Sequence, residues 1–391
     1  MKRILYLEHN VDGTVGGSHF CLLEICRSLD SNKYQPIVCF FQENTLIPEF
    51  KQTRAEVVLR SAMKPLRLRK KYFGLSTRLF QGAANMLKAL VFRTASWSLF
   101  LRKKHIDLVH INNACGYDHD LMLAAWLLRI PCVVHERGIQ PSLPPATRFF
   151  SNRIDKIITI SDAVNENLTH KGINKNKLIR IDDGIDPARL AQETPVEQLR
   201  QKWGLAEDAP VVGIVGNIKP WKGQETVVRA LIHVKDSFPG LRCFFIGSVS
   251  DIAYKKGIDE IVDEFCLQDI VLFTGYQKRP SDLIALFNVF IHASIDPEPF
   301  GIVLLEAMGK GKPVIATNIG GPREILIDGE TGFLTQPGDD KGLAERILFL
   351  LKNKEAQLEM GLRARARVYE KYTMRINMKK IESLYVELLG A

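Results

Sequence analysis

Two glutamates, Glu298 and Glu306, stand eight positions apart in a stretch that gives each of them a different local structure. Pro297 and Pro299 flank Glu298, and proline keeps the residue before it extended rather than helical. Residues 302–308 are apolar and predict a buried helix that carries Glu306 on its second turn. The free N–H groups at the start of such a helix can bind an anion such as a diphosphate. Two carboxylates beside an anion site would suit the binding of a sugar nucleotide.

A glycine-rich turn follows the first predicted strand and is a second candidate for ligand binding. Gly13, Gly16 and Gly17 precede a helix that is expected to begin near Ser18. Glycine lets backbone N–H groups approach a phosphate or a transferring sugar closely. Dinucleotide-binding domains have a similar turn with the spacing G-x-G-x-x-G, which these glycines do not match. The spacing therefore counts against NAD as the ligand.

One lysine and two histidines are further candidates. Lys222 lies at the start of a predicted helix, where a cation is unfavourable unless an anion is close, so it indicates a phosphate site. His135 and His110 each follow buried strand-like residues, and open parallel sheets bind their ligands at the carboxyl ends of strands. Either histidine could instead be a structural residue of its strand.

These residues lie in a chain whose predicted strands alternate with helices from end to end. Turn and polar residues between 183 and 210 interrupt the alternation, which then restarts. The pattern predicts an α/β fold of two domains, with parallel sheets covered by helices on both faces. Helices are expected to begin near Ser18, Asp118 and Ser161, which are good capping residues. The predicted strands are 4–8, 35–41, 107–112, 132–135, 156–160, 211–216, 242–247, 270–273, 289–292 and 313–316.

Composition limits the class of protein. The 391 residues are enough for two ordinary domains, and 46% hydrophobic with 25% charged residues is typical of a globular protein. The seven cysteines contain no C-x-x-C pair and fall mostly in apolar segments, so we expect buried thiols rather than disulfides or a zinc site. Residues 1–7 predict a buried strand rather than a signal peptide, and no apolar run reaches the roughly 20 residues that span a bilayer. We expect a cytoplasmic protein that does not cross a membrane.

The charge is unevenly distributed. The net charge is +9, yet Arg60 to Ile106 contains twelve Lys or Arg residues and no Asp or Glu. Within this stretch an apolar helical pattern is followed by Phe92 and Trp97, which suggests that Arg60–Lys104 docks on an anionic membrane surface at the inner face. The alternative is a helix packed on its domain core with a solvated basic face. No nucleic-acid-binding motif is present, and nucleic acid is not an expected partner.

The stretch from Glu298 to Glu306 resembles the E-x7-E motif of retaining glycosyltransferases of family 4. Gly16 and Gly17 match the G-G loop of that family, and Lys222 with Gly223 matches its Lys-Gly pair. The family usually has arginine where Asn217 stands, so either Lys219 or another base compensates or donor binding is weaker. His135 matches the active-site histidine. Other similar pieces are 160–162, 183–186, 275–277 and 320–324, and the resemblance runs from residue 2 to about residue 388.

This resemblance implies the GT-B fold, in which two Rossmann-like domains face each other across a cleft. Residues 1–186 would form an acceptor-binding domain and residues 187–371 a nucleotide-sugar-binding domain, and the helix in 372–391 would pack back on the first domain. The implied activity is retaining, metal-independent transfer of a hexose-type sugar from a nucleotide-diphosphate sugar to a glycan or lipid-linked acceptor, as in polysaccharide biosynthesis. No cofactor and no metal ligand are implied. The alternatives are a sugar-nucleotide epimerase on a similar scaffold and a non-catalytic carbohydrate-binding protein, which Asn217 would suit.

The resemblance also implies residue roles. Glu306 would bind the ribose hydroxyls, Glu298 would hold the transferred sugar, and Lys222 would stabilise the departing diphosphate. His135 would either position the acceptor or contact the sugar, and the sequence does not choose between them. The implied catalytic residues are Glu298, His135 and Lys222, and the implied donor-binding residues are Gly16, Gly17, Asn217, Lys222, Tyr276, Glu298, Phe300, Gly301, Ile302 and Glu306.

Overall fold

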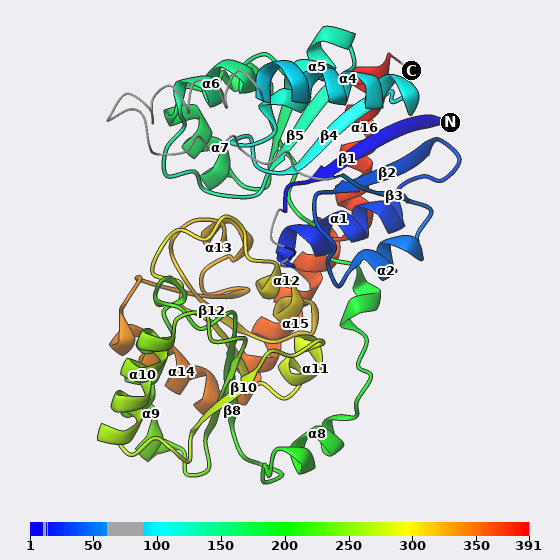
Figure 1. Ribbon diagram of the computed structural model, residues 1–391. Coiled ribbons are helices and arrows are strands. Elements are labelled where there is room, and N and C mark those ends of the chain that lie inside the picture. Colours follow the sequence, from blue (N-terminus) through cyan, green and yellow to red (C-terminus); the bar gives the residue numbers. More distant parts are fainter. Residues whose placement is uncertain (11–12, 14, 61–88, 391) are drawn as a thin grey trace, which may run out of the picture. The chain divides into compact units, whose positions relative to one another are not determined.

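The computed structural model describes residues 1–10, 13, 15–60 and 89–390. The chain divides into two compact units, each with its own sheet and core (Figure 1). Unit 1 comprises Met1–Asp182 together with Asn377–Ala391, and unit 2 comprises Asp183–Ile376. The chain therefore leaves unit 1 once and returns to it at its C-terminal end.

Unit 1 contains a seven-stranded parallel sheet in the order β3-β2-β1-β4-β5-β6-β7. Its strands are β1 (Lys2–Glu8), β2 (Tyr34–Phe40), β3 (Glu56–Leu59), β4 (Leu108–Asn113), β5 (Cys132–Glu136), β6 (Lys156–Thr159) and β7 (Leu178–Arg180). Its helices are α1 (Gly17–Ser28), α2 (Ile47–Lys51), η1 (Ala89–Arg93), α4 (Thr94–Lys103), α5 (His119–Leu128), α6 (Pro145–Ser151), α7 (Asp162–His170) and η2 (Lys175–Lys177). The five strands predicted here are confirmed. The edge strands β3 and β7 were not predicted, because four and three residues are too few to show a pattern.

Side chains of β1 alternate between two helical layers, as expected for a strand. Leu5 and Leu7 pack in a core that also contains Trp97 and Leu101 of α4. Tyr6 points the other way and contacts the last helix, α16 (Met374–Leu389). The sheet is therefore covered on both faces.

Helix α16, red in Figure 1, is fixed to unit 1 by polar contacts as well as by packing. The hydroxyl of Tyr385 lies 2.9 Å from the hydroxyl of Tyr6 and 2.6 Å from Nδ1 of His110. The carboxylate of Glu382 accepts a hydrogen bond of 2.8 Å from the backbone N–H of Asp30. The three contacts join residues that are 275, 352 and 379 positions apart. Each joins α16 to a different part of unit 1, namely β4, the loop after α1 and β1.

Unit 2 contains a six-stranded parallel sheet in the order β10-β9-β8-β11-β12-β13. Its strands are β8 (Val211–Val215), β9 (Arg242–Ile246), β10 (Val271–Gly275), β11 (Val289–His292), β12 (Val314–Thr317) and β13 (Gly332–Thr335). Its helices are η3 (Pro187–Leu190), α8 (Val196–Lys202), η4 (Pro220–Lys222), α9 (Gln224–Val234), η5 (Lys235–Ser237), α10 (Ile252–Glu264), α11 (Pro280–Ile284), α12 (Ile302–Gly309), α13 (Pro322–Ile325), α14 (Asp340–Lys352) and α15 (Lys354–Lys371). The five predicted strands are confirmed, and β13 is an additional edge strand.

Two of the expected helix caps differ in chemistry. The hydroxyl of Ser161 accepts a hydrogen bond from the N–H of Val164, as predicted for a capping serine. Asp118 stands before α5 in a left-handed conformation and does not cap it through its side chain. Its carboxylate instead pairs with Nδ1 of His9 at 2.9 Å. The Asp118 carboxylate thus makes a tertiary hydrogen bond in place of a local capping bond.

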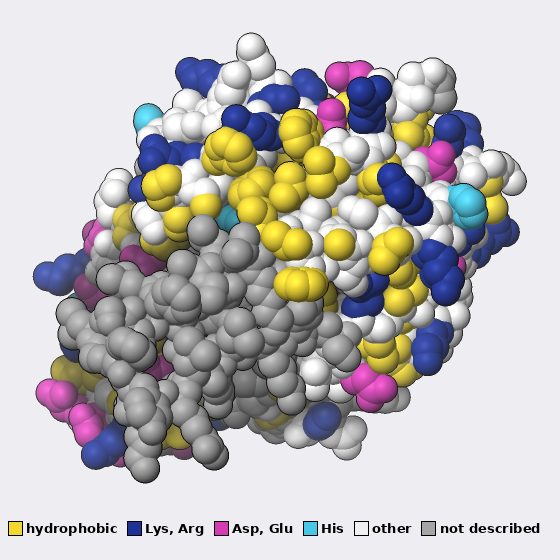
Figure 2. Space-filling model, turned by 45° about the horizontal axis from the view of Figure 1, so that its top comes forward, with side chains coloured by type: hydrophobic (Ala, Val, Ile, Leu, Met, Phe, Trp, Pro, Cys, Tyr) yellow, Lys and Arg dark blue, Asp and Glu magenta, His cyan; other side chains and the backbone are white. Residues whose placement is uncertain are grey.

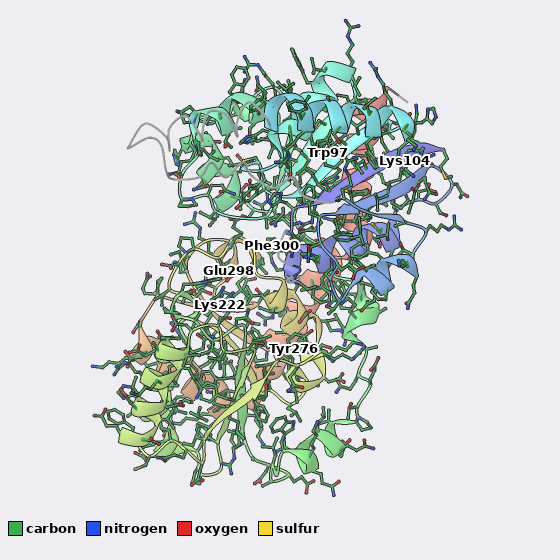
Figure 3. The ribbon with its side chains drawn as sticks, in the orientation of Figure 1. Trp97, Lys104, Lys222, Tyr276, Glu298 and Phe300 are labelled. Atoms are coloured by element: carbon green, nitrogen blue, oxygen red, sulfur yellow. The ribbon has the colours of Figure 1, made fainter. Side chains whose placement is uncertain are left out.

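Most of the basic stretch Arg60–Lys104 lies outside the described residues, since 61–88 are not described. In its described part, Trp97 is 2% exposed and packs in the core of unit 1, with the guanidinium of Arg60 at 4.2 Å from its ring (Figure 3). Lys104 pairs with Glu56. The prediction that Trp97 contributes to membrane docking is therefore wrong, because the amphipathic helix α4 uses this face to cover the sheet.

All seven cysteines are free thiols, and five of them are buried, as the sequence predicted. The residues that the structure describes include no helix with the length and apolar character needed to span a membrane.

Candidate active site

The loop that carries Glu298 joins β11 to α12 and is fixed by backbone contacts. Its backbone pairs with Gly320, and the N–H of Gly321 donates to the carbonyl of Glu298 at 2.8 Å. A Cβ atom on Gly320 would lie 2.3 Å from the Glu298 carbonyl oxygen, and Gly320 has φ of +66°. Glycine is therefore required here for two reasons, which explains the Gly-Gly sequence opposite the loop.

The carboxylate of Glu298 is surrounded by donors. Its Oε2 atom lies 2.5 Å from Nζ of Lys222, 3.1 Å from the hydroxyl of Ser294 and 3.4 Å from Nε2 of His292 (Figure 3). Burial alone would raise the pKa of Glu298, but His292 and Lys222 outweigh it and lower this pKa to about 2. Glu298 is therefore ionised at neutral pH and held in one position.

Lys222 ends the short helix η4 directly before α9. The sequence indicated a phosphate site at this lysine, which stays a prediction, and the structure has the carboxylate of Glu298 beside its ammonium group. The ammonium groups of Lys219 and Lys222 lie 4.6 Å and 4.1 Å from the centre of the Trp221 ring. Burial lowers the pKa of Lys219, and the charge of Lys222 lowers it further. Two cations thus approach a single indole ring next to Glu298, while Asn217 is exposed to solvent.

Glu306 lies on the second turn of α12 and is 7% exposed. Burial raises its pKa, although the charges of Arg189 and Lys310 oppose this. Its Oε1 atom is 3.9 Å from Nη2 of Arg189, and its Oε2 atom has no hydrogen-bond partner among the described residues. A buried carboxylate oxygen without a partner is unfavourable and calls for an explanation, such as a bound ligand with hydroxyl donors.

The other predicted donor-binding residues of unit 2 differ in exposure. The side chain of Phe300 is buried, with its ring 6.0 Å from that of Tyr372, and the predicted donor contact of this residue is through its backbone. Gly301, with φ of +111°, precedes α12, and Ile302 begins the helix. Tyr276 follows β10 and is 67% exposed. Backbone N–H groups at the start of α12 therefore lie in the same loop as Glu298.

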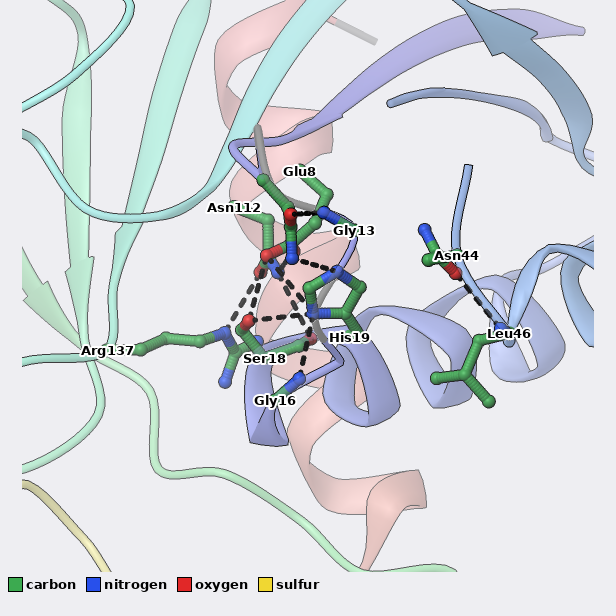
Figure 4. A network of polar contacts seen from close by, with 10 residues as sticks. Glu8, Gly13, Gly16, Ser18, His19, Asn44, Leu46, Asn112 and Arg137 are labelled. Atoms are coloured by element: carbon green, nitrogen blue, oxygen red, sulfur yellow. Dashed lines mark hydrogen bonds and ion pairs between the residues drawn. The ribbon is translucent and has the colours of Figure 1, made fainter. Parts of the chain in front are cut away.

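In unit 1, Gly16 and Gly17 lie at the start of α1 and are exposed. The neighbouring Ser18 donates its hydroxyl proton to the buried carboxylate of Glu8 at 2.8 Å (Figure 4). The side-chain amide of Asn112 donates to the same carboxylate. The glycine turn is thereby joined to the carboxyl ends of β1 and β4.

His135 lies near the end of β5 and is fully buried. Nη2 of Arg137 is 3.3 Å from its Nδ1 atom. Burial lowers the pKa of His135 well below its usual value, and the charge of Arg137 lowers it further. His135 is therefore a neutral imidazole.

His110 is placed differently from the prediction that it ends its strand. Strand β4 continues to Asn113, so His110 lies inside it, and its ring centre is 5.5 Å from that of His135. Burial lowers the pKa of His110 to about 3, and its Nδ1 atom contacts Tyr385 of α16. His110 supports His135 and α16 from within the core.

Sequence reasoning missed several residues of these two clusters. His292 ends β11 just before the Glu298 loop, so the strand-end rule that selected His135 could have found it. Ser294 and Arg189 carried no signal, because their distance from the glutamates depends on the fold. The same holds for Glu8, Asn112 and Arg137 in unit 1. The predicted residues fall into two groups, one in unit 2 and another, Gly16, Gly17 and His135, in unit 1.

Two family models match this chain. The model described as "Glycosyltransferase Family 4" matches residues 15–189, and the model described as "Glycosyl transferases group 1" matches residues 195–367. The two matches are consecutive and together cover most of both units.

Curated relatives are similar over parts of their length. N-acetyl-alpha-D-glucosaminyl L-malate synthase of Bacillus anthracis is 28% identical over 299 residues, which are 74% of this chain and 76% of that protein. Trehalose synthase of Pyrococcus horikoshii is 27% identical over 230 residues, or 56% of this chain and 54% of that protein. Sulfoquinovosyl transferase SQD2 of Arabidopsis thaliana is 30% identical over 297 residues, 71% of this chain and 56% of that protein. The chain thus spans little more than half of the latter two.

Solved structures are similar over the whole chain. Anabaena Alr3699/HepE in complex with UDP has a TM-score of 0.82 at 23% identity and covers 99% of this chain and 100% of that one. A glycosyltransferase from Rickettsia africae ESF-5 has a TM-score of 0.84 at 21% identity, with 99% and 98% covered. At these identities the likeness shows the fold, which is GT-B. With the two family models and the fold in agreement, the chain belongs to glycosyltransferase family 4 and is a glycosyltransferase of the GT-B fold.

Proposed function

We propose that this enzyme transfers a sugar, with retention of its anomeric configuration, from a nucleotide-diphosphate sugar to a glycan or lipid-linked acceptor. The proposal rests on two glutamates near the start of α12 whose carboxylates differ in their partners. Glu298 is ionised and held by Lys222, whereas Glu306 is buried with one oxygen unpartnered among the described residues. Glu298 could accept hydrogen bonds from a sugar held close to cations, and Glu306 could accept them from the hydroxyls of a ribose.

Glu306 has the chemistry to bind the ribose of the donor. Two vicinal hydroxyls can donate to its carboxylate, and this would satisfy the Oε2 atom. Anabaena Alr3699/HepE has been solved with UDP and with UDP-glucose, so a uridine nucleotide is the first donor to test. Tyr276 lies at the end of β10, and the backbone beside it would contact the base.

The diphosphate would lie between the start of α12 and the lysines beside Trp221. The N–H groups of residues 301–303 supply hydrogen bonds and a favourable helix dipole. Lys222 would stabilise the charge that develops on the departing diphosphate, and Glu298 would hold hydroxyls of the transferred sugar. With these groups we expect transfer without a divalent metal or other cofactor. The acceptor would attack from the face that the diphosphate leaves, which gives retention.

In this proposal the two units have separate roles. Unit 2 binds the nucleotide sugar, and unit 1, with Gly16, Gly17 and His135, binds the acceptor and contacts the sugar. The proposed boundaries of these functions are 1–186 and 187–371.

A thermal-shift screen with UDP, GDP, ADP and their sugars, all in EDTA, tests the donor class. A ligand at a hundred times its dissociation constant stabilises a protein by about 2.7 kcal/mol. Stabilisation by one nucleotide family would support the proposal and its independence of metal. Failure of every nucleotide would contradict it and favour a non-catalytic carbohydrate-binding role, while conversion of the nucleotide sugar without any acceptor would favour an epimerase.

We also place this enzyme in the cytoplasm, in peripheral contact with an anionic membrane surface, where a polysaccharide or lipid-linked acceptor would be presented. The support is the outer face of η1 and α4, where Phe92 and Leu99 are 65% and 69% exposed and Arg102 and Lys103 are exposed beside them. Figure 2 shows one face of the molecule, on which hydrophobic side chains lie among Lys and Arg side chains. Flotation with anionic but not neutral liposomes, reduced by Leu99→Gln, is expected. Flotation that does not depend on lipid charge would contradict the contact.

A further inference from the structure

A chain of polar contacts in unit 1 runs from the end of β1 to His135. The carboxylate of Glu8 accepts a hydrogen bond from the side-chain amide of Asn112. The side-chain carbonyl of Asn112 accepts a hydrogen bond of 2.9 Å from Nε of Arg137 (Figure 4). Nη2 of the same guanidinium then reaches Nδ1 of His135 at 3.3 Å. The first two contacts join β1 to β4 and β4 to the residue after β5, and the third lies within the end of β5. Glu8 and Asn112 are fully buried.

The direction of the last contact is fixed by chemistry. A guanidinium has five N–H donors and no acceptor, so Nδ1 of His135 must accept the hydrogen bond from Arg137. A neutral imidazole carries one proton, and if Nδ1 is the acceptor the proton is on Nε2. His135 then presents an N–H group at Nε2.

The surroundings keep the ring neutral. His135 is fully buried, the cation of Arg137 lies at its Nδ1 atom, and a second buried imidazole, His110, lies 5.5 Å away between ring centres. Burial lowers the pKa of both histidines, and Arg137 lowers each of them further. A second proton on either ring would place a cation next to a cation.

We propose that Arg137, held in place by Asn112 and Glu8, is a positioning residue that fixes His135 as a hydrogen-bond donor through Nε2. His135 therefore contacts an oxygen of the substrate and does not remove the proton of the acceptor, because its acceptor nitrogen is already occupied by Arg137. The contact with a substrate oxygen, a hydroxyl of the sugar or of the acceptor, rests on the function proposed above, whereas the orientation of the ring does not.

Glu8 has a second effect through the same carboxylate. It accepts the hydroxyl proton of Ser18 at 2.8 Å, next to Gly16 and Gly17 at the start of α1. One buried carboxylate therefore positions both the glycine turn and, through two further residues, the imidazole of His135. This explains why an acid stands at the end of β1 with no cationic lysine or arginine in direct contact among the described residues.

The test is ¹⁵N NMR of the full-length protein labelled in its histidine rings, without any ligand. The His135 resonances are assigned by their disappearance in His135→Gln. We expect a neutral ring at pH 7 with its proton on Nε2 and a hydrogen-bonded Nδ1. Arg137→Met should move the Nδ1 resonance toward that of a ring nitrogen without a donor, and Arg137→Lys, which retains a charged donor, should move it back. Glu8→Gln should cause a smaller shift in the same direction.

Arg54→Met is the matched control, because Arg54 belongs to the same unit but donates to the exposed carbonyl of Ser31. It should leave the His135 resonances unchanged. A wild-type ring with its proton on Nδ1, or with two protons at pH 7, would overturn the proposal, and so would an Nδ1 resonance that is the same in Arg137→Met and wild type. If Arg137→Met does not fold, the wild-type protonation state and Arg137→Lys still decide. The spectra need no nucleotide, so this result is separate from the success or failure of the donor screen.

Discussion

The two sheets carry different chemistry at the carboxyl ends of their strands. In unit 2 the cluster is charged: Glu298 pairs with Lys222 at 2.5 Å, and Lys219 adds a second cation beside Trp221. In unit 1 the cluster contains a neutral imidazole, that of His135, with the guanidinium of Arg137 at its Nδ1 atom. The two clusters are built on the same type of parallel sheet.

Under the proposed function, this difference would let one architecture bind two kinds of ligand. Paired charges suit a diphosphate, whose binding and departure change the local charge. Neutral donors suit sugar hydroxyls, where a hydrogen bond gives direction without attracting competing ions. The following predictions test this difference between the two clusters, in order of decreasing expected effect.

The largest effect is expected from Glu298→Gln, which leaves Lys222 without its anion and removes an acceptor for the sugar. Transfer should fall about 100- to 1,000-fold, comparable to the loss of a preorganised polar group in other active sites. Steady-state kinetics with the donor found in the thermal screen measures it. Glu260→Gln is the control, since this exposed glutamate of unit 2 lies only in a loose pair with Lys256. Wild-type turnover in Glu298→Gln would remove the charged cluster from the mechanism.

Lys222→Met should weaken binding of the nucleoside diphosphate about 10- to 100-fold, because a charge-assisted hydrogen bond is lost. Calorimetric titration with the diphosphate measures the dissociation constant. Lys255→Met provides the control: this lysine also lies over an aromatic ring, that of Phe273, and pairs with an acid on its own helix. Equal losses in both variants would show a general effect of charge rather than a site at Lys222.

The neutral character of the unit 1 cluster is tested by comparing His135→Gln with His135→Leu. Glutamine keeps an N–H donor near the position of Nε2 but does not titrate, so its kcat/KM should exceed that of the leucine variant by about tenfold. Equal loss in the two variants would mean that His135 acts as a base, and the contrast between the clusters would fail.

Lys219 is expected to contribute less to diphosphate binding than Lys222 does, and an arginine at position 217 is expected to replace it. Lys219→Ala should weaken diphosphate binding about three- to tenfold, with the larger factor at low salt because the group is partly exposed. Adding Asn217→Arg to Lys219→Ala should restore diphosphate binding, because it returns a cation to the end of the same strand. Calorimetric titration with the diphosphate at two salt concentrations measures both effects. No effect of Lys219→Ala would leave the second cation without a role.

The smallest effect concerns stability and pH. The pKa of Glu306 is raised by burial, so its contribution to stability is present below the normal carboxyl range and is lost as pH rises through the raised value. Glu306→Gln should therefore raise the Tm at pH 7 by about 2–4 °C while weakening nucleotide binding. The gain should vanish near pH 4, where the wild-type carboxyl is protonated. A lower Tm at pH 7 would show that the pair with Arg189 dominates.

Much of the fold and of the unit 2 site could be predicted, because their signals are local. Apolar runs predicted ten of the strands. The edge strands β3, β7 and β13 were not predicted, because each has too few residues to show a pattern. Pro297, Pro299 and the apolar helix placed Glu298 and Glu306 correctly in their turn and on the second turn of α12. Trp97 was assigned wrongly, since an aromatic residue on an amphipathic helix can face either the core or the surface, and only the packing of α4 decides.

The sequence alone determined the central strands of both sheets, the helix that carries Glu306 and which motif residues lie next to each other along the chain. These properties depend on backbone preferences and periodicity over a few residues. The tertiary structure decided the charge states and the partners. The pKa of Glu298 is lowered by groups from β11 and η4, and the orientation of His135 depends on residues from β1, β4 and the end of β5. Electrostatics and hydrogen bonding act through space over a few ångströms, and separation along the chain does not reveal which groups come that close.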